Sequence, residues 1–213
     1  MKQLAKCKLK SKVRPYSDGF TLLEILVSIV ILSFGLLGMV GIQAMALKSN
    51  NDARQQSAAV QLAGELSDMM RGNKAVAVAL TPATNPYLIA DYVGGAAIAN
   101  PPETCSAPAG CTSSLNVASW EKTDWLTRVN ATFPGVHVQV CYDNAPYTAG
   151  GIPQWGCAGA AAAGGSISIK IGWVRASTNN DRSTATAIAG ALTTVTGANA
   201  SPPSVIYLVT PGS

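Results

Sequence analysis

The feature that most constrains this chain is a long apolar run close to its first residue. From Phe20 to Leu47 the sequence holds twenty-eight consecutive residues with a single ionisable side chain, Glu24. As an α-helix this run measures about 42 Å, whereas the hydrocarbon core of a bilayer is about 30 Å thick. The run therefore predicts a helix that can span a membrane and leaves the remaining residues to form the folded body.

Charge is concentrated immediately before the apolar run. The first nineteen residues carry six basic side chains and Asp18, a net charge of +5, while the whole chain of 213 residues has a net charge of +4. The rest of the chain, with nine basic and ten acidic residues, therefore has a net charge of −1. The positive-inside bias places the N-terminus in the cytoplasm and everything after about residue 48 outside it. The net charge of the body therefore predicts no nucleic-acid partner. The alternative is that a local basic patch around Lys170, Arg175 and Arg182 binds DNA.

The position of Glu24 inside the apolar run needs an explanation. A carboxylate in a membrane-spanning helix costs roughly 2.5–3.5 kcal/mol, so such a group usually has a partner or a function. Near the start of the helix it can stay close to the interface and interact favourably with the helix dipole. The functional alternative is a cation from another chain, and a free α-amino group exposed by cleavage before Phe20 would supply one. An ordinary secretory signal has a shorter apolar stretch followed by a small-residue cleavage site, and neither is found here.

The sequence DGFTLLE at residues 18–24, followed by the apolar helix, resembles the processing site and N-terminal helix of type IV pilins and pseudopilins. The resemblance implies that a prepilin peptidase cuts between Gly19 and Phe20 and methylates the new N-terminal residue, Phe20. It also implies that Glu24 helps subunits to assemble. A plain, uncleaved signal anchor is the simpler alternative.

Three glycines interrupt the apolar run. The segment SIVILSFGLLGMVGIQ, with Gly35, Gly38 and Gly41, resembles minor pilins of the PilV type, which are type IV pilus modification proteins. These glycines can allow close helix packing or local unwinding. Their spacing differs from the GxxxG pattern of helix dimers, so the sequence leaves both roles open.

The helix is expected to continue beyond the apolar run. After Leu47 the sequence becomes polar without a helix breaker, and apolar residues recur at helical spacing. Arg71, followed by Gly72 and Asn73, is a suitable stop. The prediction is one helix over residues 20–72, membrane-spanning at about residues 20–47, with an apolar stripe in its second half that the body covers. The members of this stripe are Ala59, Leu62, Ala63, Leu66, Met69 and Met70.

Residues 73–213 are predicted to form an extracytoplasmic, disulfide-bonded globular domain. Three alternating segments, residues 136–142, 166–174 and 204–209, predict an antiparallel sheet with one face packed on the helix. A short helix is expected over residues 119–129, and long loops over residues 81–116, 143–165 and 175–203. The fold class is therefore α+β, with a long N-terminal helix packed on a small antiparallel sheet. The expected inward residues of the sheet are Val136, Val138, Val140, Ile167, Ile169, Ile171 and Trp173.

The cysteines support an oxidising compartment for this domain. Cys7 lies in the basic leader of residues 1–19 and would be lost on cleavage, which leaves an even set of four. Three pairings of four cysteines are possible. The pairs Cys105–Cys111 and Cys141–Cys157 are favoured because each closes a short loop rich in turn residues.

The sequence predicts no catalytic, metal or cofactor site. The single histidine, His137, is four residues from Cys141, about 13 Å along an extended strand, which is too far for a thiolate–imidazole pair. The cysteine spacings lack the short knuckles of zinc sites, and no phosphate-binding loop or serine nucleophile motif is present. Glu121 and Asp124 are expected to decorate a helix rather than to catalyse a reaction.

Together these features predict a non-enzymatic minor type IV pilin in the inner membrane, with a single span and a periplasmic C-terminal domain. Such a subunit could enter an extracellular pilus. The expected partners are the prepilin peptidase, other major and minor pilins, and inner-membrane assembly proteins. A minor pseudopilin of type II secretion is the alternative within the same architecture. An uncleaved, signal-anchored periplasmic adhesin or enzyme is the alternative from another class.

Overall fold

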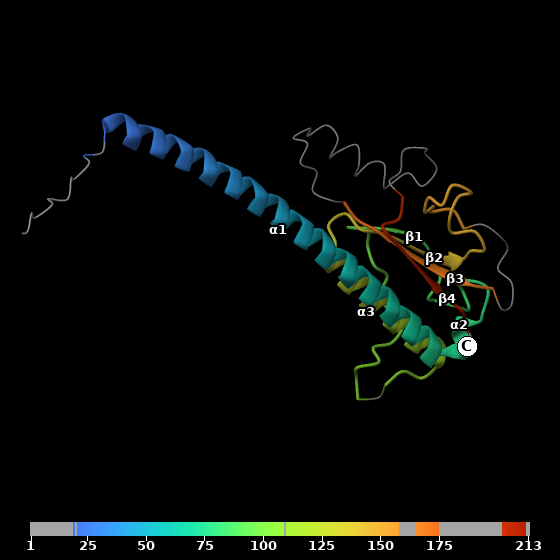
Figure 1. Cartoon of the computed structure of the whole chain (residues 1–213). Coiled ribbons are helices and arrows are strands. Elements are labelled where there is room, and N and C mark those ends of the chain that lie inside the picture. The colour runs from blue at the N-terminus through green and yellow to red at the C-terminus, as the bar shows by residue number, and fades with distance from the viewer. Residues whose placement is uncertain (1–18, 20, 109, 158–164, 175–201, 212–213) are drawn as a thin grey trace, which may run out of the picture. The chain divides into compact units, whose positions relative to one another are not determined.

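The computed structural model describes residues 19, 21–108, 110–157, 165–174 and 202–211 (Figure 1). The basic leader, including Cys7, lies outside these residues, as do Phe20, Arg175 and Arg182. The chain divides into two compact units, residues 1–48 and residues 49–213. A long helix plus an antiparallel sheet gives the α+β arrangement that the sequence predicts.

One continuous helix, α1, runs from Leu22 to Gly72 and crosses the boundary between the two units. It ends at Gly72, which is the last residue of the predicted helix. The Asn73 amide still donates to the Met69 carbonyl oxygen, and the short helix α2, Lys74–Ala77, follows. The absence of Pro and the dominance of good helix-forming residues explain why the polar second half continues the apolar first half.

Within the described residues, four antiparallel strands form a single sheet in the order β1-β2-β3-β4. The three predicted strands are present as β2 (His137–Tyr142), β3 (Ile167–Gly172) and β4 (Val205–Val209). The strand β1 (Ile89–Val93) lies within the expected loop of residues 81–116, so that part of the loop prediction is wrong. β1 is only five residues long, and an irregularity in its pairing between Ile89 and Tyr92 breaks the alternation by which a strand is recognised.

The inward face of the sheet is the one that the sequence predicts. Ile167, Ile169 and Ile171 are fully buried and lie between apolar partners on β2 and β4. Ile169, for example, pairs with Val140 on one side and with Tyr207 on the other. Alternating apolar residues on three neighbouring strands therefore form the centre of the core.

Helix α3, Ser114–Thr132, packs on the second half of α1 and extends beyond the expected residues 119–129 at both ends. Ser113 caps it, because its hydroxyl accepts a hydrogen bond from the Asn116 amide at 3.2 Å. Trp125 is fully buried, and its indole N–H donates to the carbonyl oxygen of Leu62 at 2.7 Å. This bond joins α3 to the part of α1 that belongs to the same unit.

The outward face of the sheet is also buried along β2 and β3, although the sequence predicts burial of one face only. His137, Gln139, Ser168 and Lys170 are each at most 8% exposed. The segment of residues 143–157 covers this face: Trp155 stacks on His137 with ring centroids 3.8 Å apart. Lys170 is therefore buried. Its inclusion in a basic surface patch for nucleic acid is wrong.

Candidate functional site

The start of α1 carries the residues of the expected processing and assembly site. Gly19 is exposed, and a Cβ atom there would meet nothing within 4 Å. Thr21 caps the helix: its hydroxyl oxygen accepts from the Glu24 amide at 3.3 Å, and its carbonyl oxygen accepts from the Ile25 amide at 3.3 Å. The capping role of Thr21 was missed in the sequence, although a threonine three residues before an acidic residue is a signal for it.

Glu24 lies in the first turn of α1, where a carboxylate interacts favourably with the helix dipole. Its side chain is exposed, and the ion pairs found among the described residues all involve other side chains. The structure thus fits the helix-dipole interpretation and leaves room on Glu24 for a cation from another chain. Phe20, whose amine is the expected cation, lies outside the described residues.

The first half of α1 around Glu24 presents apolar side chains on every side. An 18-residue window of this helix has a mean hydropathy of 2.7, and none of it is buried within the chain. Leu22 is 88% exposed and Leu37 is 69% exposed. The segment is long and apolar enough to cross a membrane, and such a surface requires lipid or other chains to cover it.

Two serines of this apolar half are satisfied by their own helix. The hydroxyl of Ser28 donates to the carbonyl oxygen of Glu24 and that of Ser33 to the carbonyl oxygen of Ile29, each at 2.7 Å. Side chains bonded in this way are compatible with a lipid environment. Cβ atoms added at the three glycines of this half, residues 35, 38 and 41, would meet nothing within 4 Å, so no contact within the chain requires them.

Both expected disulfides are present in the C-terminal unit, Cys105–Cys111 and Cys141–Cys157. A carboxylate closes the base of the smaller loop, because Glu103 accepts hydrogen bonds from the Thr112 amide at 2.7 Å and from the Thr112 hydroxyl at 2.5 Å. These bonds lower the pKa of Glu103. Each loop is thus closed by a disulfide, and the smaller loop is also held by hydrogen bonds to the ionised Glu103.

A buried ammonium group fixes the segment of residues 143–157 to the sheet. Lys170 of β3 donates to the Asp143 carboxylate at 2.5 Å and to the carbonyl oxygens of Trp155 at 3.1 Å and Gly156 at 2.7 Å. The side chains of Lys170 and Asp143 are fully buried. All three ammonium donors are used, so this lysine has a structural role and no free proton donor for chemistry.

His137 and Cys141 form no nucleophile–base pair. Cys141 is held in a disulfide, and the Nε2 atom of His137 interacts with the Asp91 carboxylate of β1. The imidazole is 1% exposed and covered by Trp155. The arrangement ties β1, β2 and the covering segment together, and it offers a substrate no access to the histidine.

Of the two carboxylates expected to decorate a helix, Glu121 contacts a residue outside α3, whereas Asp124 contacts Arg128 of the same helix. Glu121 accepts a hydrogen bond from the Tyr87 hydroxyl. Burial, followed by the bond to Glu121 and its charge, raises the pKa of Tyr87. Asp124 interacts with Arg128 at 3.0 Å, and the Arg128 guanidinium also makes two bonds to Glu65 of α1 at 2.6 and 2.7 Å. The bonds between Arg128 and Glu65 strengthen the packing of α3 on α1.

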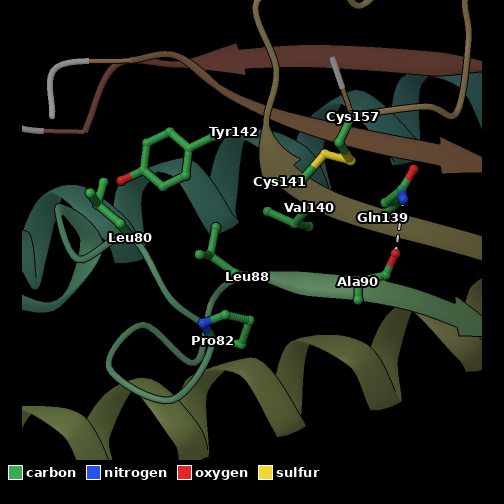
Figure 2. A pocket seen from close by; sticks show the side chains of 9 residues that line it. All are labelled: Leu80, Pro82, Leu88, Ala90, Gln139, Val140, Cys141, Tyr142 and Cys157. Atoms are coloured by element: carbon green, nitrogen blue, oxygen red, sulfur yellow. Dashed lines mark hydrogen bonds between the residues drawn. A yellow bond between two sulfur atoms is a disulfide. The ribbon is translucent and has the colours of Figure 1, made fainter. Parts of the chain in front are cut away.

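A pocket of about 290 Å³ lies beside the Cys141–Cys157 disulfide, between β1, β2 and the turn after α2 (Figure 2). The described residues that line it are all uncharged: Leu80, Pro82, Leu88, Ala90, Gln139, Val140, Cys141, Tyr142 and Cys157. The Gln139 amide is engaged, because its nitrogen donates to the Ala90 carbonyl oxygen at 2.9 Å. The described lining residues therefore include no paired acid and base of the kind that a hydrolytic site uses. Across the described ranges, no group of three His, Cys, Asp or Glu side chains could hold a metal ion.

Comparison with known proteins places a recognisable motif at the start of α1 and leaves the rest of the chain unmatched. A comparison with curated proteins and one with solved structures each find no match. Residues 14–40 match the family model described as the prokaryotic N-terminal methylation motif. This range contains Gly19, Phe20 and Glu24 together with most of the apolar half of α1. The chain thus carries, over these residues, the N-terminal methylation motif that is typical of type IV pilins and pseudopilins.

Proposed function

We propose that this protein is a minor type IV pilin, a structural subunit that primes or modifies a pilus or is incorporated into it. The observation that carries the proposal is the methylation motif at the start of a helix whose whole apolar half is uncovered within its own chain. A helix of this kind can be stored in a membrane and later packed against the helices of other subunits. Prepilin peptidase is the processing enzyme that the motif implies.

The chemistry of assembly in this proposal depends on one carboxylate and one amine. Cleavage between Gly19 and Phe20 frees an α-amino group, and methylation leaves that group protonated. Glu24 is exposed in the first turn and has no ion-pair partner among the described residues. A buried carboxylate is tolerated when a cation lies within hydrogen-bonding reach. The amine of a neighbouring subunit's first residue would therefore offset the cost of burying Glu24 in an assembled filament.

The proposed topology is a single span in the inner membrane with residues 49–213 in the periplasm. The basic leader supports a cytoplasmic N-terminus through the positive-inside bias. The two disulfides support an oxidising compartment for the C-terminal unit. A non-enzymatic role is supported by the structural engagement of three ionisable groups of the C-terminal unit, His137, Lys170 and Glu121.

N-terminal analysis of the mature protein tests this function. The expected result is a chain that begins at N-methylated Phe20, and a mature chain that retains Met1 would contradict the proposal. In addition, Glu24→Ala and the isosteric Glu24→Gln should both be processed normally and yet enter filaments at a strongly reduced level. Asp52→Asn is the matched control, because it removes an acidic group from the same helix outside the apolar half, and it should enter filaments normally.

The same motif is typical of pseudopilins, so a minor pseudopilin of type II secretion is the second candidate. Processing and the requirement for Glu24 are expected in both cases. Deletion of the protein separates them: loss of surface filaments with normal protein export supports the pilin. Intact filaments with stalled export would assign the chain to secretion instead.

A further inference from the structure

The covering segment of residues 143–157 carries a small hairpin at its tip. Tyr147 and Pro153 form an antiparallel bridge, and the Thr148 amide donates to the Ile152 carbonyl oxygen at 2.8 Å. Gly151 takes a φ of 78° in the turn, a conformation that favours glycine. We refer to residues 146–154 as the tip hairpin.

The tip hairpin is held rigidly at its base as well as across its strands. The Gln154 amide donates to the Pro146 carbonyl oxygen at 3.0 Å, and the Gln154 side chain donates to the Ala145 carbonyl oxygen at 2.6 Å. Below these bonds lie the Cys141–Cys157 disulfide and the buried Lys170 ammonium, which holds both ends of the segment. A contact made by such a preorganised element loses little conformational entropy on binding.

Two large apolar side chains are exposed on this rigid element. Tyr147 is 45% exposed and Ile152 is 58% exposed. Residues 144–156 contain no Asp, Glu, Lys, Arg or His, so the segment that presents the two side chains carries no formal charge. An exposed tyrosine on a rigid, neutral support is typical of the residues that dominate protein–protein contacts. The chemistry favours a neutral, apolar protein surface as the partner.

The size of this surface restricts the partner further. Two side chains bury at most a few hundred Å², well below the roughly 1,200 Å² of a stable interface between free proteins. A small contact of this kind becomes effective when both partners are already held close together, because tethering raises the effective concentration to about the millimolar range. The anchoring helix supplies that tether for chains in the same membrane or filament.

We propose that the tip hairpin docks on the C-terminal domain of a neighbouring subunit that carries the same kind of N-terminal anchor. Tyr147 and Ile152 make this contact, which adds to the contact between helices. The inference rests on the proposed function. It assigns a role in subunit contact to a segment that lies far in sequence from the methylation motif.

Site-specific photo-cross-linking in the full-length, membrane-borne protein tests the proposal. A p-benzoylphenylalanine probe at position 149, in the exposed turn, should cross-link to a chain that begins with an N-methylated residue, as identified by mass spectrometry. Probes at positions 115 and 208 are the controls, because Leu115 and Leu208 are also exposed but lie on α3 and β4. The yield at position 149 should exceed both controls about tenfold.

Substitutions of the contact side chains should remove this cross-link. Tyr147→Ser combined with Ile152→Ser should lower the yield from position 149 about tenfold, whereas Tyr147→Phe, which keeps the ring, should retain it. Leu208→Ser is the matched control for loss of an exposed apolar side chain. Mapping of the Cys141–Cys157 disulfide in each variant shows that the segment has formed.

Each sample is also analysed for cleavage after Gly19. An uncleaved chain would overturn the proposed function, and the docking inference with it. A cleaved and methylated chain whose position 149 cross-links no more than the controls would overturn the docking inference alone. Cross-linking only to proteins without an N-methylated terminus would also overturn the docking inference alone.

Discussion

The two halves of α1 belong to one continuous helix and have opposite surroundings. In the second half, Ala59, Ala63, Leu66 and Met70 are at most 1% exposed, because α3 and the rest of the C-terminal unit cover them. In the first half, no residue of the apolar window is buried within the chain. The helical spacing of apolar residues therefore predicts contacts within the chain only in the second half. In the first half, the apolar surface indicates what lies outside the chain.

The ionisable groups of the two units differ in the same way. Lys170 is fully buried in the C-terminal unit, and its three donors are satisfied by Asp143 and two carbonyl oxygens. Glu24 lies on an apolar helix and has no ion-pair partner among the described residues. The C-terminal unit thus pairs its buried charges internally, whereas the unpaired carboxylate on the apolar helix supports the assembly role proposed for Glu24.

The largest expected effect comes from breaking the internally paired charge. Lys170→Ala should destabilise residues 49–213 by about 3–5 kcal/mol, because it leaves the Asp143 carboxylate buried without its cation. Denaturant unfolding of the full-length protein in detergent micelles, followed by tryptophan fluorescence, measures the loss. Trp155, whose carbonyl oxygen accepts from Lys170, is a natural reporter.

Lys48→Ala is the control for this experiment, because Lys48 is an exposed lysine of α1, and its removal should change stability by less than about 0.5 kcal/mol. The double variant Lys170→Met with Asp143→Leu should recover part of the loss, since no unpaired charge remains. Equal stability of Lys170→Ala and Lys48→Ala would show that the buried ion pair does not hold the covering segment.

A matched pair of leucines tests the two halves of α1 directly. Leu66→Ala should lower the unfolding free energy of the C-terminal unit by about 2–5 kcal/mol, because it opens a cavity in the core. Leu36→Ala, in the apolar half, should leave the same unfolding transition unchanged, since Leu36 is 57% exposed within the chain. A comparable loss from both substitutions would contradict the separation of the two units.

Much of the fold follows from local sequence patterns. The helix, its end near Arg71, β2 and β3 could be predicted because their periodicity is regular over six or more residues, and β4 because it is a short apolar run that follows turn residues. β1 could not, because a bulge in five residues removes the alternation. Burial of the outer sheet face could not be predicted either. It depends on a contact between Trp155 and His137, which are eighteen residues apart, and no short-range pattern encodes such a contact.

For the candidate site, the sequence shows more than the folded chain does. Gly19, Phe20 and Glu24 are recognisable from sequence because the methylation motif is one contiguous stretch, in which the order of the residues alone sets their spacing. The proposed partner of Glu24 belongs to another subunit, so it is not found within one folded chain. The tip hairpin, in contrast, becomes visible only in the structure, because its rigidity depends on Lys170 and on a disulfide.

The disulfides should have smaller and unequal effects on the C-terminal unit. In the chain-entropy model, the Cys141–Cys157 bond, with a separation of 16 residues, stabilises by about 3 kcal/mol. The Cys105–Cys111 bond, with a separation of 6, stabilises by about 2 kcal/mol. Paired Cys→Ser substitutions at each bridge, compared by denaturant unfolding, measure the difference. A larger loss at Cys105–Cys111 would mean that the covering segment is held mainly by Lys170 rather than by its disulfide.

The smallest effect is expected at an exposed ionised group, Glu103. Its pKa in the folded protein is lowered, chiefly by the hydrogen bond from the Thr112 hydroxyl, relative to an ordinary value of 4.5. A carboxyl whose pKa is lowered on folding stabilises the protein above its unfolded-state pKa, and this contribution disappears as the pH falls through the folded-state value. The Tm of the wild type should therefore be slightly higher than the Tm of Glu103→Gln at pH 6 to 7. This difference in Tm should disappear below about pH 4.5. A gap that stays constant down to pH 3 would assign the difference to packing rather than to charge, and would remove Glu103 from the groups that fix the smaller disulfide loop by ionisation.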